Sequence, residues 1–302
     1  MTLESWIRWL YGQHGAARPG EQNTLSEWKA VLATGALEFS QQGRLPQYDA
    51  LFVDEAQDLM HEEVQLLSRW SPVLFFVGDD RQKIYEHSNG LEALRQLESG
   101  PQEMVLPFHY RLAPELCQMA DRILLPEGGT GLAETSHYNG PRPGRIETAG
   151  PLTKNDILQQ AADKLRDQIR AYADLIQQGD KLGVIVARTE DRNLVHNYLE
   201  NDPELEGKSQ IIRARTGDED DSDYDPSLDP DNPICILTMQ GCKGLEFRAV
   251  HWLFCDDLSK HHNAEHYYTV VTRAKTSLDI YFVRSLPQVL ARAYSPPAGD
   301  LW

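Results

Sequence analysis

A pair of acidic residues that directly follows a short apolar run is the clearest candidate for chemistry. Residues 50–53 (Ala-Leu-Phe-Val) form the run, and Asp54 and Glu55 come next. Such a run is typical of a buried parallel strand, and ligands of open α/β sheets lie outside the carboxyl ends of the strands. There Asp54 can hold Mg²⁺, which prefers oxygen ligands, and Glu55 can orient or deprotonate an attacking water. For the pair alone, a strand that ends in a solvated acidic turn is the simpler interpretation.

A second apolar run ends in the same kind of residue. Residues 72–77 (Pro-Val-Leu-Phe-Phe-Val) are followed by Gly78 and then by a polar stretch that includes Gln82 and Tyr85. A strand followed by a small residue and polar groups is the arrangement of a sheet edge that faces phosphate. The two runs therefore predict neighbouring strands with their functional groups at one edge.

Composition narrows the classes of protein that fit. With 302 residues, of which 41% are hydrophobic, one to three domains are expected and two are the central estimate. The formal net charge of −17 argues against a generally basic surface for nucleic acid, although a local basic groove stays open. The four cysteines show no C-x-x-C spacing and favour reduced thiols over disulfides or a zinc site. We find no signal peptide and no run of about 18 apolar residues, so we expect no membrane partner and a cytoplasmic location.

The pattern of apolar residues predicts helices and strands in alternation. Helices are expected at about residues 2–11, 24–41, 61–68, 90–98, 114–125, 155–178 and 264–274, with one of about ten residues from Thr189. Strands are expected at about residues 50–53, 72–77, 105–106, 145–148, 182–187, 211–214, 234–237, 249–254 and 278–283. Residues 126–143 predict a linker or an exposed loop. Residues 216–232, with eight acids, predict a mobile acidic loop and not a calcium loop.

Five blocks in this order resemble the signature of superfamily 1 helicases of the UvrD/Rep type. The blocks are Val53–Asp58 (VDEAQD), Val77–Tyr85 (VGDDRQKIY), Pro107–Leu112 (PFHYRL), Leu237–Phe247 (LTMQGCKGLEF) and Tyr268–Lys275 (YTVVTRAK). The resemblance implies an α/β fold of two RecA-like domains with mainly parallel sheets, the first one incomplete. The partial first motor domain would span residues 1–112, and the second, helicase C-terminal domain would span residues 113–302.

The resemblance also implies roles at an ATP and Mg²⁺ site. Asp54 resembles the Mg²⁺-binding acid, Glu55 the catalytic base and Gln82 the glutamine that senses the γ-phosphate. Arg111 and Arg273 resemble the two γ-phosphate arginines, whose planar guanidinium groups fit phosphate oxygens.

The remaining motif residues would bind the rest of the nucleotide and the nucleic acid. Tyr110 resembles the residue that stacks on adenine, and Gly244 and Glu246 match the block at the γ-phosphate region and the ribose hydroxyl. The resemblance places Tyr85 against a nucleic-acid base, and Thr238 and Gln240 against the nucleic-acid backbone.

Taken singly, these residues also fit ordinary structural roles. Arg111 can form a surface ion pair, Arg273 and Lys275 can be a solvated helix end, and the two tyrosines can pack in a core. Lys243 fits backbone contact and simple solvation equally well. The functional interpretation depends on the joint pattern.

The family's phosphate loop, G-x-x-x-x-G-K-[ST], does not occur in the printed sequence. We therefore expect the chain to be the C-terminal portion of a longer helicase or one half of a split protein. The stretch between Arg111 and Thr238 is needed for the second domain, so it holds no large accessory domain, and the resemblance is to compact members.

Two functions of different classes fit the sequence. The first is ATP-dependent translocation on, or unwinding of, DNA, with single-stranded DNA or a DNA junction as partner and another chain supplying the phosphate loop. The second is a non-catalytic helicase remnant that binds nucleic acid or protein. An unrelated α/β enzyme would require the five ordered blocks to be coincidence.

Overall fold

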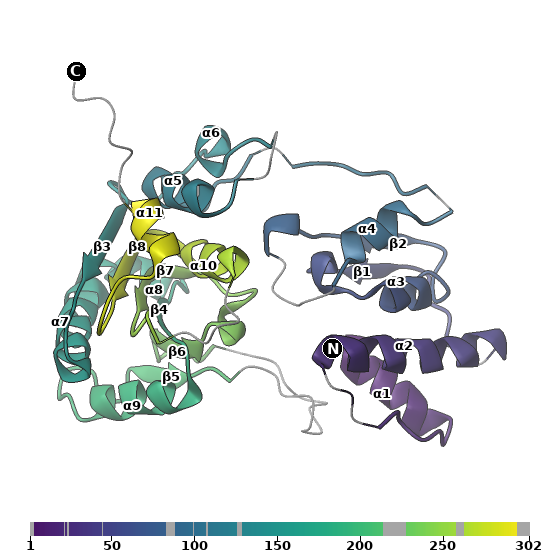
Figure 1. The fold of residues 1–302 in the computed structure, drawn as a ribbon. Coiled ribbons are helices and arrows are strands. Elements are labelled where there is room, and N and C mark those ends of the chain that lie inside the picture. The colour runs from purple at the N-terminus through teal and green to yellow at the C-terminus, as the bar shows by residue number, and fades with distance from the viewer. Residues whose placement is uncertain are drawn as a thin grey trace. The chain divides into compact units, whose positions relative to one another are not determined.

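A computed structural model describes residues 3–20, 22, 24–43, 45–82, 88–98, 100–106, 108–125, 129–213, 228–257 and 263–294, with Ser40 described only in its backbone. These residues form two compact units, the first running to Val105 and the second starting at Leu106. Figure 1 shows the elements of both, and each unit is described by itself. Tyr85 and all of the acidic loop 216–232 except residues 228–232 lie outside the described residues.

The division between the units precedes the 112/113 boundary that the sequence predicts. The segment before Ala113 packs with the second unit, where Leu112 is buried and a parallel bridge joins His109 to Ser136. The Ala113 N–H also donates to the Lys275 carbonyl oxygen at 2.8 Å. These bonds place Tyr110 and Arg111 in the second unit.

The first unit is a small parallel sheet with helices. Its elements are α1 (Leu3–Gln13), α2 (Leu25–Gln41), β1 (Leu51–Val53), η1 (Ala56–Asp58), α3 (His61–Leu67), β2 (Leu74–Phe76), η2 (Asp80–Gln82) and α4 (Gly90–Arg95). Strands β1 and β2 pair in parallel with Phe52 opposite Phe75. As the sequence predicts, Thr24 caps α2, because its Oγ1 accepts a hydrogen bond from the Glu27 N–H at 3.1 Å.

One face of this two-stranded sheet is covered and the other is open. Leu51, Val53 and Phe76 pack against the core that the helices form. On the other face Phe52 is 78% exposed and Phe75 is 56% exposed, with their ring centroids 5.7 Å apart. Parallel sheets are normally buried on both faces, so this open face is unusual.

The second unit contains a six-stranded sheet in which every pair of neighbouring strands is parallel. Its helices are α5 (Pro114–Ile123), α6 (Leu132–Thr135), α7 (Lys154–Ala171), α8 (Ala173–Gln177), α9 (Thr189–Glu200), η3 (Gln240–Cys242), α10 (Ala264–Val271) and α11 (Gln288–Tyr294). Its strands are β3 (Arg145–Ala149), β4 (Leu182–Val186), β5 (Ser209–Ile211), β6 (Ile234–Thr238), β7 (Phe247–Trp252) and β8 (Ala274–Tyr281), in the order β3-β8-β7-β4-β6-β5.

Helices cover both faces of this larger sheet (Figure 1). Side chains of α5, α10 and α11 pack on one face, with Trp252 of β7 in that core. Side chains of α7 and α9 pack on the other face, with Val184 of β4 in that core. Every residue of β4, β6 and β7 is buried, which explains why the sequences of β4 and β6 are nearly continuous apolar runs.

The fold class predicted from sequence, α/β with mainly parallel sheets, is confirmed by both sheets. Most predicted elements are present within a few residues of the expected bounds. In the described part of the chain, no helix combines the length and the apolar character needed to cross a membrane.

Four local predictions are wrong. Residues 105–106 form no strand, and Val105 and Leu106 are exposed, because a strand needs a neighbour that completes its hydrogen bonds. The predicted linker 126–143 contains α6 and the buried Tyr138. The helix predicted to reach residue 178 is interrupted at Tyr172, between the end of α7 at Ala171 and the start of α8 at Ala173. The helix predicted to end at residue 274 stops at Val271, because β8 already begins at Ala274.

Each unit contains a carboxyl group whose pKa is shifted, and the two shifts have opposite directions. In the first unit, burial raises the pKa of Glu63 although Lys29 lies 3.5 Å away. In the second unit, Asp180 accepts hydrogen bonds from Lys275 at 2.9 Å and from Arg248 Nε at 2.8 Å. Burial pushes the pKa of Asp180 up, but these two cations outweigh it and the pKa is lowered.

Candidate functional site

The two carboxylates of the first block lie where the sequence predicts, immediately after β1 in the first unit. The Asp54 Oδ1 accepts a hydrogen bond from the Glu55 N–H at 2.8 Å. Glu55 has φ 54°, in the left-handed region that residues other than glycine rarely adopt. Backbone strain of this kind is concentrated at functional sites, so the conformation supports a functional role for this turn.

A buried amide, Gln57, links the first block to the second. Gln57 is 2% exposed, and its Nε2 donates to the Glu55 Oε2 at 2.5 Å. Its Oε1 accepts from the Asp79 N–H at 3.1 Å. A Cβ on Gly78 would lie 2.7 Å from that Oε1, so only glycine admits the amide. Gln57 therefore fixes the Glu55 carboxylate relative to the end of β2.

Gln82 belongs to the same group through Asp79. The Gln82 Nε2 donates to the Asp79 Oδ2 at 3.3 Å, and the Arg81 Nε donates to the Asp79 Oδ1 at 3.1 Å. The structure thus brings Asp54, Glu55 and Gln82 to one edge of the small sheet.

Sequence reasoning missed Gln57 and Asp79 as positioning residues. Gln57 lies in the first motif block and Asp79 in the second, but neither had been given a role. Gly78 directly after the apolar run 72–77 was the available signal, since glycine often marks a place where another group approaches the backbone closely.

The acidic residues of the first unit fit a shared magnesium site better than a complete protein cage. Among the residues that the structure describes, no group of three or more His, Cys, Asp or Glu side chains could hold a metal ion. Mg²⁺ is usually held by one or two carboxylates together with substrate phosphates and water. Asp54 meets that requirement, with Glu55 next to it.

Residues from two distant blocks meet in the second unit. Arg111 forms an ion pair with Glu246, which lies just before β7. Gly244 has φ 76°, and a Cβ there would meet nothing within 4 Å. Glycine is therefore needed at residue 244 for its backbone conformation and not for space.

Arg273, from the fifth block, lies in the turn between α10 and β8 and is only 6% exposed. Its Nε donates to the Thr269 carbonyl oxygen at 3.1 Å, and one terminal nitrogen donates to the Leu245 carbonyl oxygen at 3.2 Å. The side chain is thus held in a fixed position against the turn that carries Glu246, and not as a solvated helix end.

The charge balance of this group favours an anion. Arg111 pairs with Glu246, and Arg273 donates to the carbonyl oxygen of the preceding residue, Leu245, so the two arginines lie near each other. Burial and the positive charge of Arg273 lower the pKa of Arg111. Arginine nonetheless stays protonated in proteins. Two guanidinium groups and one carboxylate leave one positive charge in excess, which suits phosphate oxygens.

The predicted nucleic-acid contacts differ in exposure. Gln240 is exposed at the start of η3, as a contact residue must be. Thr238 is buried at the end of β6, and its Oγ1 accepts from the Gly241 N–H at 3.3 Å. The structure therefore gives Thr238 a role in shaping the turn. Tyr85 lies outside the described residues.

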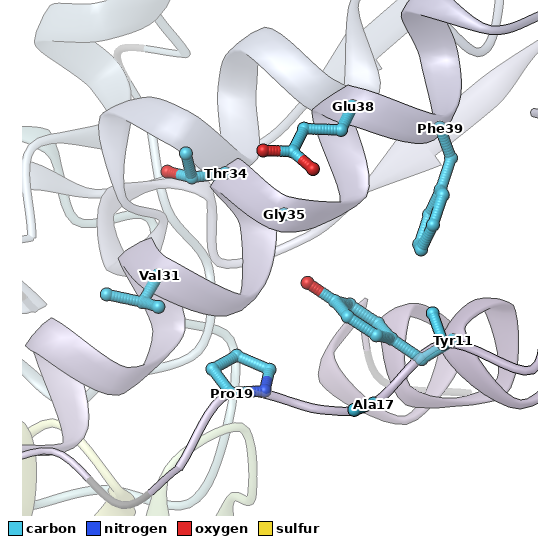
Figure 2. Close-up of a pocket in the computed structure, with 9 residues that line it drawn as sticks. Tyr11, Ala17, Pro19, Val31, Thr34, Gly35, Glu38 and Phe39 are labelled. Atoms are coloured by element: carbon cyan, nitrogen blue, oxygen red, sulfur yellow. The ribbon is translucent and has the colours of Figure 1, made fainter.

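The first unit also contains a hollow of about 420 Å³ between α2 and the segment after α1 (Figure 2). Tyr11, Phe39 and Glu38 are among its lining residues. The Tyr11 hydroxyl donates to the Leu32 carbonyl oxygen at 3.1 Å and passes Gly35, where a Cβ would lie 1.9 Å from it. No lining residue belongs to a motif block, so the hollow is not part of the candidate site.

No family model matches the chain, and no curated protein matches it. Solved structures do match. One is the C-terminal domain of a possible DNA helicase from Lactobacillus plantarum WCFS1, with 19% identity and a TM-score of 0.38, over 61% of this chain and 93% of that chain. A second is the PRRSV helicase, with 13% identity and a TM-score of 0.40, over 77% of this chain. A third is arterivirus nonstructural protein 10, a helicase, with 14% identity and a TM-score of 0.44, over 82% of this chain.

The matched regions span 34% of the PRRSV helicase chain and 42% of the arterivirus chain. The chain is thus similar to parts of helicases. At these identities and scores, the similarities do not establish a shared activity.

Proposed function

We propose that the chain is the motor part of a UvrD-like, superfamily 1 helicase-type protein, which uses ATP to move along or unwind DNA. One observation carries the proposal. Arg111, Glu246 and Arg273 come from three separate sequence blocks, and their side chains gather at one place in the second unit. The five ordered blocks predict such a group, and three isolated residues with unrelated structural roles do not.

Each unit offers half of the chemistry that ATP hydrolysis requires. In the second unit, Arg111 presents guanidinium donors that can bind phosphate oxygens, and the buried Arg273 adds positive charge that can stabilise a transferring phosphoryl group. In the first unit, Gln57 holds the Glu55 carboxylate so that it can orient an attacking water. When bound beside Asp54, Mg²⁺ would neutralise phosphate charge. In this proposal each unit is a RecA-like domain.

A phosphate loop is the part of the machinery that the printed sequence lacks. We place that loop on another polypeptide segment that completes the first unit. The exposed apolar face of β1 and β2 supports this placement, because parallel sheets are ordinarily covered on both faces. The chain by itself should therefore hydrolyse ATP negligibly.

Two measurements on the purified chain test the proposal. The first is fluorescence anisotropy with a labelled single-stranded oligothymidine at low salt, with and without ATP and Mg²⁺. We expect binding that Gln240→Ala and Tyr85→Ala each weaken and that ATP alters, because a motor couples its two ligands. Gln118→Ala, an exposed glutamine on α5, is the matched control.

The second measurement is steady-state ATP turnover, which we expect at background level. Turnover that is easily measured and that Glu55→Gln abolishes would contradict the need for a loop from elsewhere. Absence of oligonucleotide binding, both with and without ATP, would contradict the motor proposal itself.

A non-catalytic binding module is the second candidate. The absent phosphate loop and the open apolar face of the first unit both favour it. It predicts oligonucleotide or protein binding that is the same with and without ATP, so the anisotropy experiment separates the two functions.

A further inference from the structure

Three aromatic rings form an exposed cluster beside the arginine group of the second unit. Phe108 is 54% exposed and Tyr110 is 58% exposed, and His137 is also exposed. The His137 ring meets Phe108 edge to face, with centroids 4.8 Å apart and planes at 86°. It lies more nearly parallel to Tyr110, at 5.7 Å and 34°. The sequence blocks include the first two rings but give no indication of His137.

Backbone hydrogen bonds fix the two segments that carry these rings. The His109 N–H donates to the Thr135 carbonyl oxygen at 3.2 Å, and the His137 N–H donates to the His109 carbonyl oxygen at 2.8 Å. Side chains alternate along an extended segment, so Phe108 and Tyr110 point one way and His109 the other. The His109 ring is turned inward, with its Nε2 2.8 Å from the Leu132 carbonyl oxygen. Backbone hydrogen bonds therefore hold in place the two segments that carry the outward rings.

The charged neighbours of the cluster indicate what it can bind. Arg111 follows Tyr110 directly and forms an ion pair with Glu246. The positive charge of Arg273 also acts on Arg111 and lowers its pKa. A flat aromatic surface next to an excess of positive charge matches a molecule that has a planar ring at one end and phosphates at the other. Nucleotides have that form, and aromatic rings stack on any base through its face.

Resting on the nucleotide site proposed above, we infer that His137 and Phe108 are positioning residues that hold the Tyr110 ring for stacking on the base of a bound nucleotide. The His137 ring packs against the Tyr110 ring, and the Phe108 ring packs edge to face with His137 and so holds it in place. The phosphates would then extend towards Arg111. The segment after α6, which belongs to none of the motif blocks, would then have a role in nucleotide recognition.

Saturation-transfer NMR with ATP on the full chain tests this inference, since it detects weak binding and reports which ligand protons touch the protein. We expect signals from the adenine protons for the unmodified chain. His137→Ala should weaken ATP binding by ~5-fold or more, the lower end of a stacking contribution, and should reduce the adenine signals more than the ribose signals. His137→Phe keeps a ring and should restore them. His61→Ala, in the first unit, is the control.

Inorganic tripolyphosphate separates the base from the phosphates. It should displace ATP equally well from the unmodified chain and from His137→Ala, which shows that the variant is folded and its arginines are in place. Unchanged adenine signals in His137→Ala with intact displacement would overturn this inference alone. Loss of oligothymidine binding without loss of ATP binding would assign the rings to nucleic acid and overturn it too. No binding of ATP or tripolyphosphate by the unmodified chain would overturn both proposals.

Discussion

The two parallel sheets of this chain bury their strands to very different degrees. In the second unit all residues of β4, β6 and β7 are buried, and helices lie on both faces. In the first unit β1 and β2 are each three residues long, and the middle residue of each is exposed. Both sheets nevertheless place motif residues just beyond or beside their strands.

The difference shows two ways of holding polar groups in place. Around the large sheet, position comes from burial, as with Arg273, whose guanidinium donates to the carbonyl oxygens of Thr269 in α10 and of Leu245. At the small sheet, position comes from one amide, Gln57, which spans the ends of the two strands. The first arrangement should tolerate loss of a single hydrogen bond better than the second.

The largest expected effect contrasts two phenylalanines. Phe247→Ala removes a fully buried ring from the large sheet and should destabilise the second unit by ~3–5 kcal/mol, through lost burial and the cavity left behind. Phe75→Ala, on the open face, should change the first unit by about 0.5 kcal/mol or less, as surface substitutions do. Hydrogen exchange followed by mass spectrometry reads each unit separately. A large loss at Phe75 would mean that its face is covered in solution.

The second prediction concerns the amide that joins the strand ends. Gln57→Leu keeps the bulk but removes both hydrogen bonds, and it should destabilise the first unit by ~1–3 kcal/mol because buried polar partners are left unsatisfied. Protection of the Asp79 amide against exchange should fall with it. Gln65→Leu, an exposed position on α3, is the matched control and should have little effect. Equal protection in both variants would refute the bridging role.

A smaller effect is expected at the turn that carries Glu246. Gly244→Ala should destabilise the second unit by ~1–2 kcal/mol, because the left-handed backbone disfavours a Cβ even though space is available. Gly207→Ala, also left-handed with open space, should lose a similar amount and serves as the reference. If Gly244→Ala reduces ATP binding and Gly207→Ala does not, the turn also acts in the site.

The smallest effects are pH slopes, and they should have opposite signs in the two units. The lowered pKa of Asp180 gives the second unit stability that is present above about pH 4 and is lost as the pH falls through the folded pKa. The raised pKa of Glu63 gives the first unit a contribution that is complete below about pH 4 and is lost as the pH rises through the folded pKa. Asp180→Asn and Glu63→Gln should each flatten the slope of their own unit in exchange measurements from pH 3 to pH 7. Slope changes of equal sign in the two variants, each compared with the unmodified chain, would contradict the two environments.

The sequence predicts the fold class and most elements, because apolar runs such as residues 182–187 and caps such as Thr24 are local signals. It fails where a distant partner decides. Val105 and Leu106 have the composition of a strand, but among the described residues no strand pairs with them. Strand β8 begins at Ala274 because its pairing with β7 starts there.

The candidate site is predictable in its residues but not in its geometry. The blocks identify Arg111, Glu246 and Arg273, yet the ion pair between the first two and the burial of the third depend on tertiary packing. The position of His137 could not be predicted from the sequence, because it is backbone hydrogen bonds between residues 109 and 135–137 that bring its ring to Tyr110.

The backbone of Glu55 also determines how mutants of this residue should be interpreted. At its φ of 54°, glycine is the residue that the turn would accept most easily. Replacement by glycine would therefore remove the carboxylate and relax the backbone at the same time, and we expect the variant to resist heat better. Glutamate is thus less favourable for folding at this position than glycine would be, which points to a requirement other than stability.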